Sequence, residues 1–317
     1  MVDKPDYNAL IDAQTWEFIR ETERWFPDTA PDEPIADQRR RYDLMCDAFR
    51  SSRPPDVRVA DLNADGVAIR VCSVSSGTTG PSVIYAHGGS LMMGGLDSHD
   101  DVCAEICAAT RMQVINVDYR LLPEATLSDA QTDMQVALDW ARASGAGPFV
   151  CVGDSAGGYL IAHMVYQNRM QNDIAGQVLI YPGLTAGCDG GSMDVHAFAP
   201  LLKAADICSY RQKLRDTNAG GENTRADLTR ALGLADLPQT LTISAECDPM
   251  ADDARLYADN INIAGGQAIW VQDAGLVHGH LRARHRVDRA GQSFGRILRG
   301  ISVMATGTRL TAGMLWQ

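Results

Sequence analysis

The stretch Phe149-Val-Cys-Val-Gly-Asp-Ser-Ala-Gly-Gly158 decides the fold of this chain of 317 residues. An apolar run with two β-branched valines leads into Gly153, and a helix-like run from Tyr159 to Met170 follows. A strand, a sharp turn and a helix therefore meet at Ser155, in the G-x-S-x-G pattern of a strained turn that exposes a serine. The glycines allow close backbone approach, and the helix start favours a developing anion. A Gly-rich turn of this kind also binds phosphate in nucleotide folds, so other residues must decide.

The composition is that of a globular protein, with 45% apolar residues and a formal charge of −12. The densest basic run, Arg39-Arg40-Arg41, is short, which argues against nucleic-acid binding. The N-terminus is polar, and no stretch approaches 18 uninterrupted apolar residues. The sequence therefore predicts neither a signal peptide nor insertion into a membrane.

The eight cysteines are scattered and contain no C-x-x-C pair. Cys103 and Cys107 would share one helix face, but no clustered histidines complete a metal site. The pattern predicts reduced thiols of a cytoplasmic protein, with no disulfide framework and no bound metal.

Residues 1–50 are predicted to form two helices separated by prolines. A hairpin follows, because residues 57–62 and 67–74 alternate in polarity across a polar, Gly-containing turn. From there, apolar strands alternate with helices. The predicted strands are 82–86, 113–117, 149–152, 176–181, 239–244 and 267–271, and the predicted helices are about 99–110, 129–143, 156–170, 251–264 and 282–301.

This alternation predicts an α/β fold with a mostly parallel sheet covered by helices on both faces. Residues 184–230 break the rhythm and are interpreted as an insertion over the sheet, helical from about Leu201 to Leu214. The tail 302–317 is not assigned to an element.

A serine nucleophile needs a base, and the base needs an orienting acid. Asp248 follows the strand that ends at Ser244, and His278 follows the strand that ends near Val271. Together with Ser155, they stand in the chain order Ser, Asp, His and at the same edge of a parallel sheet. The sequence therefore predicts a catalytic triad of Ser155, Asp248 and His278.

Nearby residues compete for two of these roles. Asp252 and Asp253 fall in the first turn of the next helix, where solvated carboxylates are expected. His280 is the main rival of His278, which is favoured because Gly279 lets the backbone turn directly after it. His285 is expected at the surface or at a helix cap.

An acyl-transfer site also needs N–H groups that bind the oxyanion. One candidate is the amide of Ala156, directly after the nucleophile. The others are Gly88, Gly89 and Ser90, in the loop that follows the strand 82–86. His87 is expected to hold this loop by hydrogen bonds.

Five motifs now resemble those of one family. They are His87-Gly-Gly-Ser-Leu-Met-Met-Gly-Gly-Leu-Asp-Ser-His-Asp100, Val117-Asp-Tyr-Arg-Leu-Leu-Pro-Glu124, Gly153-Asp-Ser-Ala-Gly-Gly158, Ala245-Glu-Cys-Asp-Pro-Met250 and Val277-His-Gly279. In this order, across about residues 55–300, they resemble the bacterial hormone-sensitive-lipase family (family IV) of α/β-hydrolase esterases. The resemblance implies an eight-stranded sheet with a helical cap, and cofactor-free hydrolysis of short- to medium-chain carboxylic esters.

The resemblance also suggests a division of the chain. Residues 1–52 would be an arm of the cap, 184–230 the cap insertion, and 53–183 and 231–317 the two parts of the hydrolase core. Members of the family often form homodimers through the last strand, for which residues 268–271 are the candidate.

Three residues depart from the family pattern. Ser90 and Leu91 replace a glycine and an aromatic residue, which should widen the acyl side of the pocket. His280 stands where phenylalanine is common and would place a second titratable ring beside the triad. Leu91 and His280 are therefore predicted to line the substrate pocket.

Other functions stay open at this stage. The same triad could hydrolyse lactones, carbamates or amides, because a fold does not settle the chemistry. A non-catalytic receptor of this fold would lack the histidine that is present here. A nucleotide site is disfavoured, because no Gly-Lys-Ser/Thr follows the Gly-rich turn.

Overall fold

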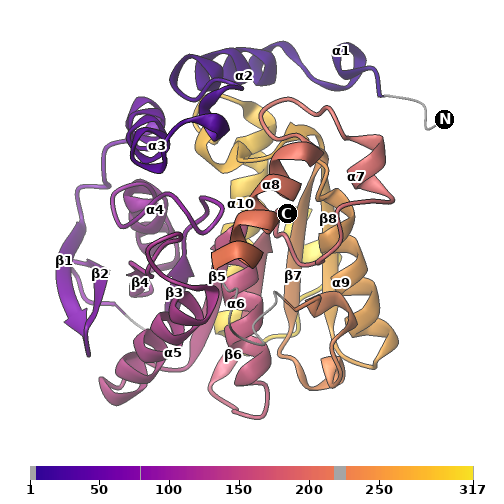
Figure 1. Cartoon of the computed structure of the whole chain (residues 1–317). Coiled ribbons are helices and arrows are strands. Elements are labelled where there is room, and N and C mark those ends of the chain that lie inside the picture. Colours follow the sequence, from indigo (N-terminus) through magenta and orange to yellow (C-terminus); the bar gives the residue numbers. More distant parts are fainter. Residues whose placement is uncertain (1–4, 79, 218–225, 317) are drawn as a thin grey trace.

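A computed structural model describes residues 5–78, 80–217 and 226–316 of the chain. Its centre is an eight-stranded sheet in the order β1-β2-β4-β3-β5-β6-β7-β8 (Figure 1). The antiparallel pairs are β1 with β2 and β2 with β4, and all other neighbours are parallel. The predicted α/β fold with a mostly parallel eight-stranded sheet is therefore confirmed. The strands are β1 (Val57–Ala64), β2 (Val67–Val74), β3 (Ser82–Ala86), β4 (Val114–Val117), β5 (Phe149–Asp154), β6 (Ile174–Ile180), β7 (Thr240–Cys247) and β8 (Ala268–Val277).

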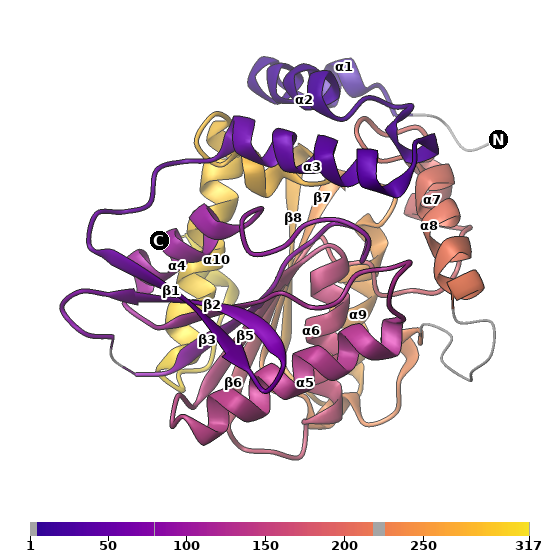
Figure 2. The same ribbon diagram turned by 60° about the vertical axis from the view of Figure 1, so that its left-hand side comes forward.

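Helices cover both faces of this sheet (Figures 1 and 2). Alternate residues of β3 show the division, since Ile84 packs in one hydrophobic cluster and Tyr85 in the other. The first cluster includes residues of α5, α6 and α9, and the second includes residues of α4 and α10. The covering helices are α4 (Asp100–Thr110), α5 (Leu127–Ala143), α6 (Ala156–Gln167), α9 (Ala251–Ile263) and α10 (Asp288–Ala305).

The N-terminal arm packs across one end of the sheet, above the carboxyl ends of the parallel strands (Figure 2). It contains α1 (Tyr7–Leu10), α2 (Ala13–Trp25), a 3₁₀ turn at Ala30–Asp32 and α3 (Ile35–Phe49). Phe18 of α2 and Phe49 of α3 are buried and meet edge to face at 5.1 Å. The two predicted helices of the arm are thus present as α2 and α3, and the proline-containing segment 26–34 connects them.

The predicted insertion lies beside this arm. It carries α7 (Ser192–Val195), α8 (Ala204–Thr217) and a 3₁₀ turn at Leu228–Arg230, while its residues 218–225 lie outside the described residues. Tyr7 and His196 form a hydrogen bond, and Lys203 forms an ion pair with Asp28. Two segments about 180 residues apart in sequence therefore meet over the sheet.

Some boundaries near the C-terminus differ from the prediction. β8 runs to Val277 rather than 271, and α10 starts at Asp288 rather than 282 because residues 280–283 form a separate 3₁₀ turn. The unassigned tail continues α10 to Ala305 and ends in a 3₁₀ turn at Ala312–Trp316. There Arg299 donates to the carbonyl of Leu315, whose side chain is buried.

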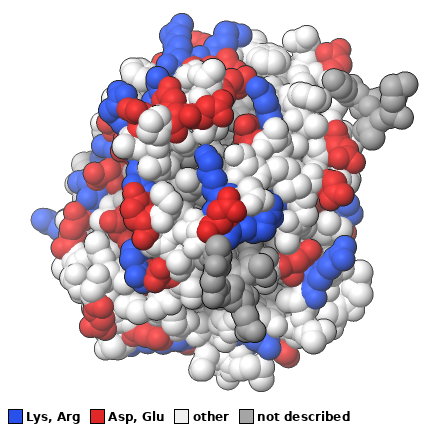
Figure 3. Space-filling view, viewed as in Figure 1, with Lys and Arg blue, Asp and Glu red and all other residues white. Residues whose placement is uncertain are grey.

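Acidic and basic side chains are interspersed over the face shown in Figure 3. No helix among the described residues is both long and apolar enough to cross a membrane.

Candidate active site

Ser155 sits in a strained turn between β5 and α6. Its backbone has φ 53° and ψ −117°, in the left-handed region that non-glycine residues rarely adopt. Its amide donates to the carbonyl of Ile180, which fixes the turn to β6. A Cβ on Gly157 would overlap with the carbonyl oxygen of Ala86, so only glycine allows α6 to start this close to β3. The sequence-predicted geometry of the G-x-S-x-G turn is present.

Ser155, His278 and Asp248 form one hydrogen-bonded chain. Nδ1 of His278 lies 2.7 Å from Oδ2 of Asp248, and Nε2 of His278 lies 2.9 Å from Oγ of Ser155. An ionised carboxylate can only accept, so Nδ1 carries the proton and Nε2 accepts from the serine hydroxyl. Asp248 is fully buried, and its other oxygen accepts the amide of Met250 at 2.8 Å. The acid therefore fixes the tautomer that a general base needs.

The structure gives other partners to the alternative acids, Asp252 and Asp253, and to His285. Asp252 accepts the amide of Ser192 and pairs with Arg255. Asp253 is buried rather than solvated, contrary to expectation, because it accepts the amides of Leu184 and Thr185 at the start of the insertion. His285 is exposed and pairs with Glu105.

The prediction that His280 lines the substrate pocket is wrong. Its side chain is only 1% exposed and contacts the carbonyl of Val277 and the hydroxyl of Ser293. Gly279, with φ 76°, turns the chain into the 3₁₀ segment 280–283 and so directs His280 into the core beside Asp273. The ring of Tyr181 contacts both imidazoles, with centroids 4.8 Å from His278 and 5.0 Å from His280.

The donor loop after β3 contains one further correction. The amide of Gly88 donates to Oδ1 of Asp154 at 2.9 Å, so it is already occupied and the prediction that it binds an oxyanion is wrong. Among the described residues, the amides of Gly89, Ser90 and Ala156 have no acceptor, and all three residues line the same cavity as Ser155. These three amides are the available donors.

The backbone of this loop is unusual. Gly89 has φ 125°, and a Cβ there would overlap with the carbonyl oxygen of Met93, so glycine is required. Ser90 and Leu91 also have positive φ values, 58° and 63°, although neither is glycine. Such strain persists only where the surroundings hold it, and it clusters at functional sites.

His87 and Asp154 fix the start of the donor loop after β3. Nδ1 of His87 contacts the carbonyl of Gly88 at 2.8 Å, and Tyr119 donates to the carbonyl of His87 at 2.6 Å. Burial and the neighbouring His99 lower the pKa of His87 to about 4, which keeps the ring neutral. This agrees with the predicted loop-holding role.

Asp154 was not identified from the sequence, although it precedes the nucleophile. It is buried and accepts from Tyr85 and Gly88, with His99 3.3 Å away. Burial alone would raise its pKa, but the contacts with His99 and Tyr85 outweigh this and lower the pKa to about 2. A permanent carboxylate thus fixes the first glycine of the donor loop and leaves the next two amides free.

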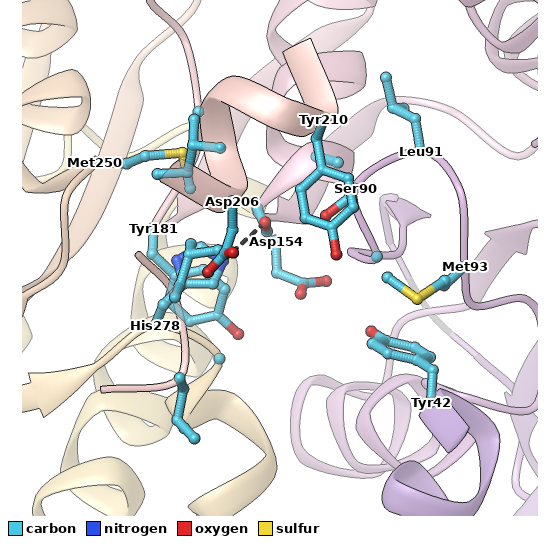
Figure 4. Close-up of a pocket in the computed structure, with 18 of the residues that line it drawn as sticks. Tyr42, Ser90, Leu91, Met93, Asp154, Tyr181, Asp206, Tyr210, Met250 and His278 are labelled. Carbon is cyan, nitrogen blue, oxygen red and sulfur yellow. Dashed lines mark hydrogen bonds between the residues drawn. The ribbon is translucent and has the colours of Figure 1, made fainter. Parts of the chain in front are cut away.

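A cavity of about 170 Å³ opens above Ser155. In Figure 4, His278 and Met250 lie on one side, and Leu91, Met93 and Tyr42 lie on the other. Leu91 lines the cavity, as predicted. The arm and the insertion build the outer wall, through residues that sequence reasoning did not single out, including Phe26, Met45, Asp206, Tyr210 and Arg211.

Among the described residues, no group of three or more His, Cys, Asp or Glu side chains could hold a metal ion. The absence of a metal and of a cofactor remains a prediction.

Comparison with known proteins identifies the family. The family model of the alpha/beta hydrolase fold matches residues 83–282 of this chain. The carboxylesterase NlhH of Mycobacterium tuberculosis is 32% identical over 230 residues, which cover 68% of this chain and 71% of NlhH. The ethyl acetate hydrolase of Pseudomonas putida is 30% identical over 67% of this chain and 70% of its own length.

Solved structures agree with this result. An esterase of the bacterial hormone-sensitive lipase family superposes with a TM-score of 0.82 over 93% of this chain and 99% of its own, at 23% identity, which shows the shared fold. The esterase of Pyrobaculum calidifontis has a TM-score of 0.77 at 26% identity, over 86% of this chain and 95% of its own. The chain belongs to the alpha/beta hydrolase family. Its five motifs resemble those of the hormone-sensitive-lipase branch of that family.

Proposed function

We propose that this protein is a serine carboxylesterase that hydrolyses short- to medium-chain esters through an acyl-enzyme. The observation that carries the proposal is the hydrogen-bonded chain from Asp248 through His278 to Ser155, beside unoccupied amides that line the same cavity. The names of the esterase relatives support the same reaction.

In the first half of the reaction, Ser155 attacks the ester carbonyl while His278 takes its proton. Asp248 stabilises the imidazolium that forms. The amides of Gly89, Ser90 and Ala156 bind the oxyanion, and each such donor is worth about 100- to 1000-fold in rate. His278 then protonates the leaving alcohol, and a water molecule activated by His278 releases the acid in the second half.

The size of the cavity supports a short acyl chain. A cavity of about 150 Å³ accommodates benzene, and this one measures about 170 Å³. We therefore expect activity to peak at or below about eight carbons, because a walled pocket closes around a limited volume.

A nitrophenyl-ester series from acetyl to dodecanoyl tests the proposal together with Ser155→Ala. The variant should lose at least about 10⁴-fold in kcat/KM, since the oxyanion donors alone cannot supply a nucleophile. Wild-type activity in Ser155→Ala would overturn the triad, and a peak at long chains would overturn the size limit. Lactones, carbamates and amides in the same panel should react more slowly than the esters.

Two further proposals concern the oligomeric state and the cellular location of the protein. Among the described residues, no strand pairs with the outer edge of β8, so we propose that two copies associate there as a homodimer. The eight cysteines are free thiols, six of them buried, which fits a cytoplasmic protein.

A further inference from the structure

The wall of the catalytic cavity contains a buried arginine without hydrogen bonds. Arg211 of α8 is only 5% exposed and lines the cavity. Its three guanidinium nitrogens are buried and have no hydrogen-bond acceptor among the described residues. A carboxylate oxygen of Asp253 lies 3.9 Å from Nη2, beyond hydrogen-bonding distance. A buried cation is expensive unless it is both paired and hydrogen-bonded, and this guanidinium has an ion pair with Asp253 but no hydrogen-bond acceptor among the described residues.

A second arginine lines the same cavity from the side of the catalytic histidine. Arg282 lies one turn after His278, and its Nη2 lies against the backbone of Gly279. Its Nε is buried without an acceptor, and no carboxylate of the described residues forms an ion pair with it. Its guanidinium carbon lies 5.7 Å from the centroid of the Tyr42 ring, a cation–π contact.

Three acidic groups near the cavity accept hydrogen bonds from groups other than the two arginines. Both oxygens of Asp253 accept hydrogen bonds from Leu184 and Thr185. Asp206 lines the cavity, but it accepts the amide of Lys203 in the first turn of α8. Asp154 is committed to Tyr85, Gly88 and His99. The two guanidinium groups therefore bring buried nitrogens without acceptors among the described residues to the cavity, and both groups are positively charged.

We propose that the natural substrate is an ester that carries a carboxylate, which Arg211 and Arg282 bind. This inference rests on the proposed esterase function and adds the substrate class. A guanidinium holds a carboxylate through two parallel hydrogen bonds, which would satisfy donors that the free protein leaves unpaired. The covalent chemistry is unchanged: the acyl–oxygen bond breaks, the alcohol leaves with a proton, and water supplies the hydroxyl of the new acid.

Monomethyl esters of malonic to adipic acid test the proposal, because they combine a short acyl chain with a carboxylate. Each is compared with its monoamide methyl ester, which has nearly the same shape but no charge, and with a methyl ester of an ω-amino acid of similar length. Release of methanol measures kcat/KM for all three classes. The wild-type protein should prefer the anionic ester over its neutral amide by at least about tenfold, and the cationic ester should be the poorest.

Three variants and one control distinguish a role of the arginines in carboxylate binding from a role in folding. Arg282→Gln and Arg211→Gln should each lower kcat/KM for the anionic ester by about 10- to 100-fold, while kcat/KM for the neutral amide changes by less than about threefold. Arg282→Lys should retain part of the preference, because the charge remains but the paired donors are lost. Arg215→Gln is the matched control, since Arg215 lies one turn after Arg211 on α8 but is exposed and donates to the side chain of Gln212.

Two results would overturn the carboxylate proposal while leaving the esterase intact. One is a wild-type enzyme that hydrolyses the neutral ester at least as well as the anionic one. The other is an equal loss for both esters in Arg211→Gln and Arg282→Gln, which would assign the arginines a structural role. If the wild-type protein hydrolyses none of the methyl esters and none of the nitrophenyl esters, the proposed function itself fails.

Discussion

His87, at the base of the donor loop, is buried between two other rings. The centroid of Tyr119 lies 4.3 Å from it, and that of His99 lies 5.8 Å from it. Burial disfavours the protonated form of the His87 ring, and the neighbouring imidazole of His99 adds to this effect, so the pKa falls to about 4. The loop that offers the amides of Gly89 and Ser90 therefore depends on a histidine that must stay neutral.

A pH dependence of stability follows from this residue. Because the unfolded histidine binds a proton at about pH 6.5 and the folded one only at about 4, the stabilisation is fully present above pH 6.5. It should decrease as the pH falls through this interval, by about 3 kcal/mol in the free energy of unfolding.

Urea unfolding between pH 7 and pH 4 measures this effect. His87→Gln, which cannot take up the proton, should show a shallower slope over the same range. His285→Gln is the control, because it removes an exposed histidine outside the donor loop, and the slope should change more in His87→Gln than in this variant. An equal slope in His87→Gln and in wild type would contradict the assignment.

For single residues, the sequence predicted the meeting of the triad but not the orientation of His280. The spacing of Ser155, Asp248 and His278 was sufficient to predict that these three meet, because each follows a parallel strand and the strand ends share one edge. The orientation of His280 was not predictable in this way. It depends on a positive φ at Gly279 and on the partners Asp273 and Ser293, which come from β8 and α10.

Among the elements, α2 and α3 form the part of the arm that shapes the cavity. Phe18 of α2 is 2% exposed and packs against Phe49, while Tyr42 and Met45 of α3 line the pocket. Packing in the arm and the shape of the acyl site are therefore coupled.

Phe18→Ala should reveal this coupling. Loss of the ring should lower the free energy of unfolding by about 3–5 kcal/mol, and the loosened α3 should raise KM for short esters. Denaturant unfolding and ester kinetics measure the two effects. Leu44→Ala, on the exposed side of α3, should change stability by less than about 0.5 kcal/mol and leave KM unchanged. A normal KM in a clearly destabilised Phe18→Ala would separate the arm from the pocket.

The sequence predicted most elements because continuous apolar runs bounded by glycine or proline mark buried parallel strands. It missed the second half of β8, where Asp273 and Gly275 interrupt the apolar run. Asp273 is nevertheless buried, because Arg296 of α10 pairs with it. A partner from a distant element cannot be read from local periodicity. The same holds for Arg211, whose place in the cavity wall depends on how the insertion folds back over the sheet.

In the molecule as a whole, β8 forms the edge of the sheet at its parallel end, where a strand of a second copy could pair. In the described part of the chain, β8 pairs with β7 alone, and Gln272 is exposed in the middle of β8. We expect light scattering after size exclusion to give twice the chain mass of 34.3 kDa. Gln272→Lys, which places a charge on the edge, should shift the protein to the monomer without loss of ester hydrolysis. A monomeric wild type at micromolar concentration would contradict the dimer.

The contact between the arm and the insertion also bears on how the chain is made. Tyr7 and His196 are 189 residues apart, so at about 5–20 residues per second the ribosome needs about 10–40 seconds to deliver the second partner after the first. During this interval the apolar faces of α2 and α3, with Phe18 and Met45, lack β8 and the 3₁₀ turn 280–283, which they contact in the folded chain. The arm is thus made before the segments that bury it, and a newly made chain should depend on chaperones at this arm more than at the sheet.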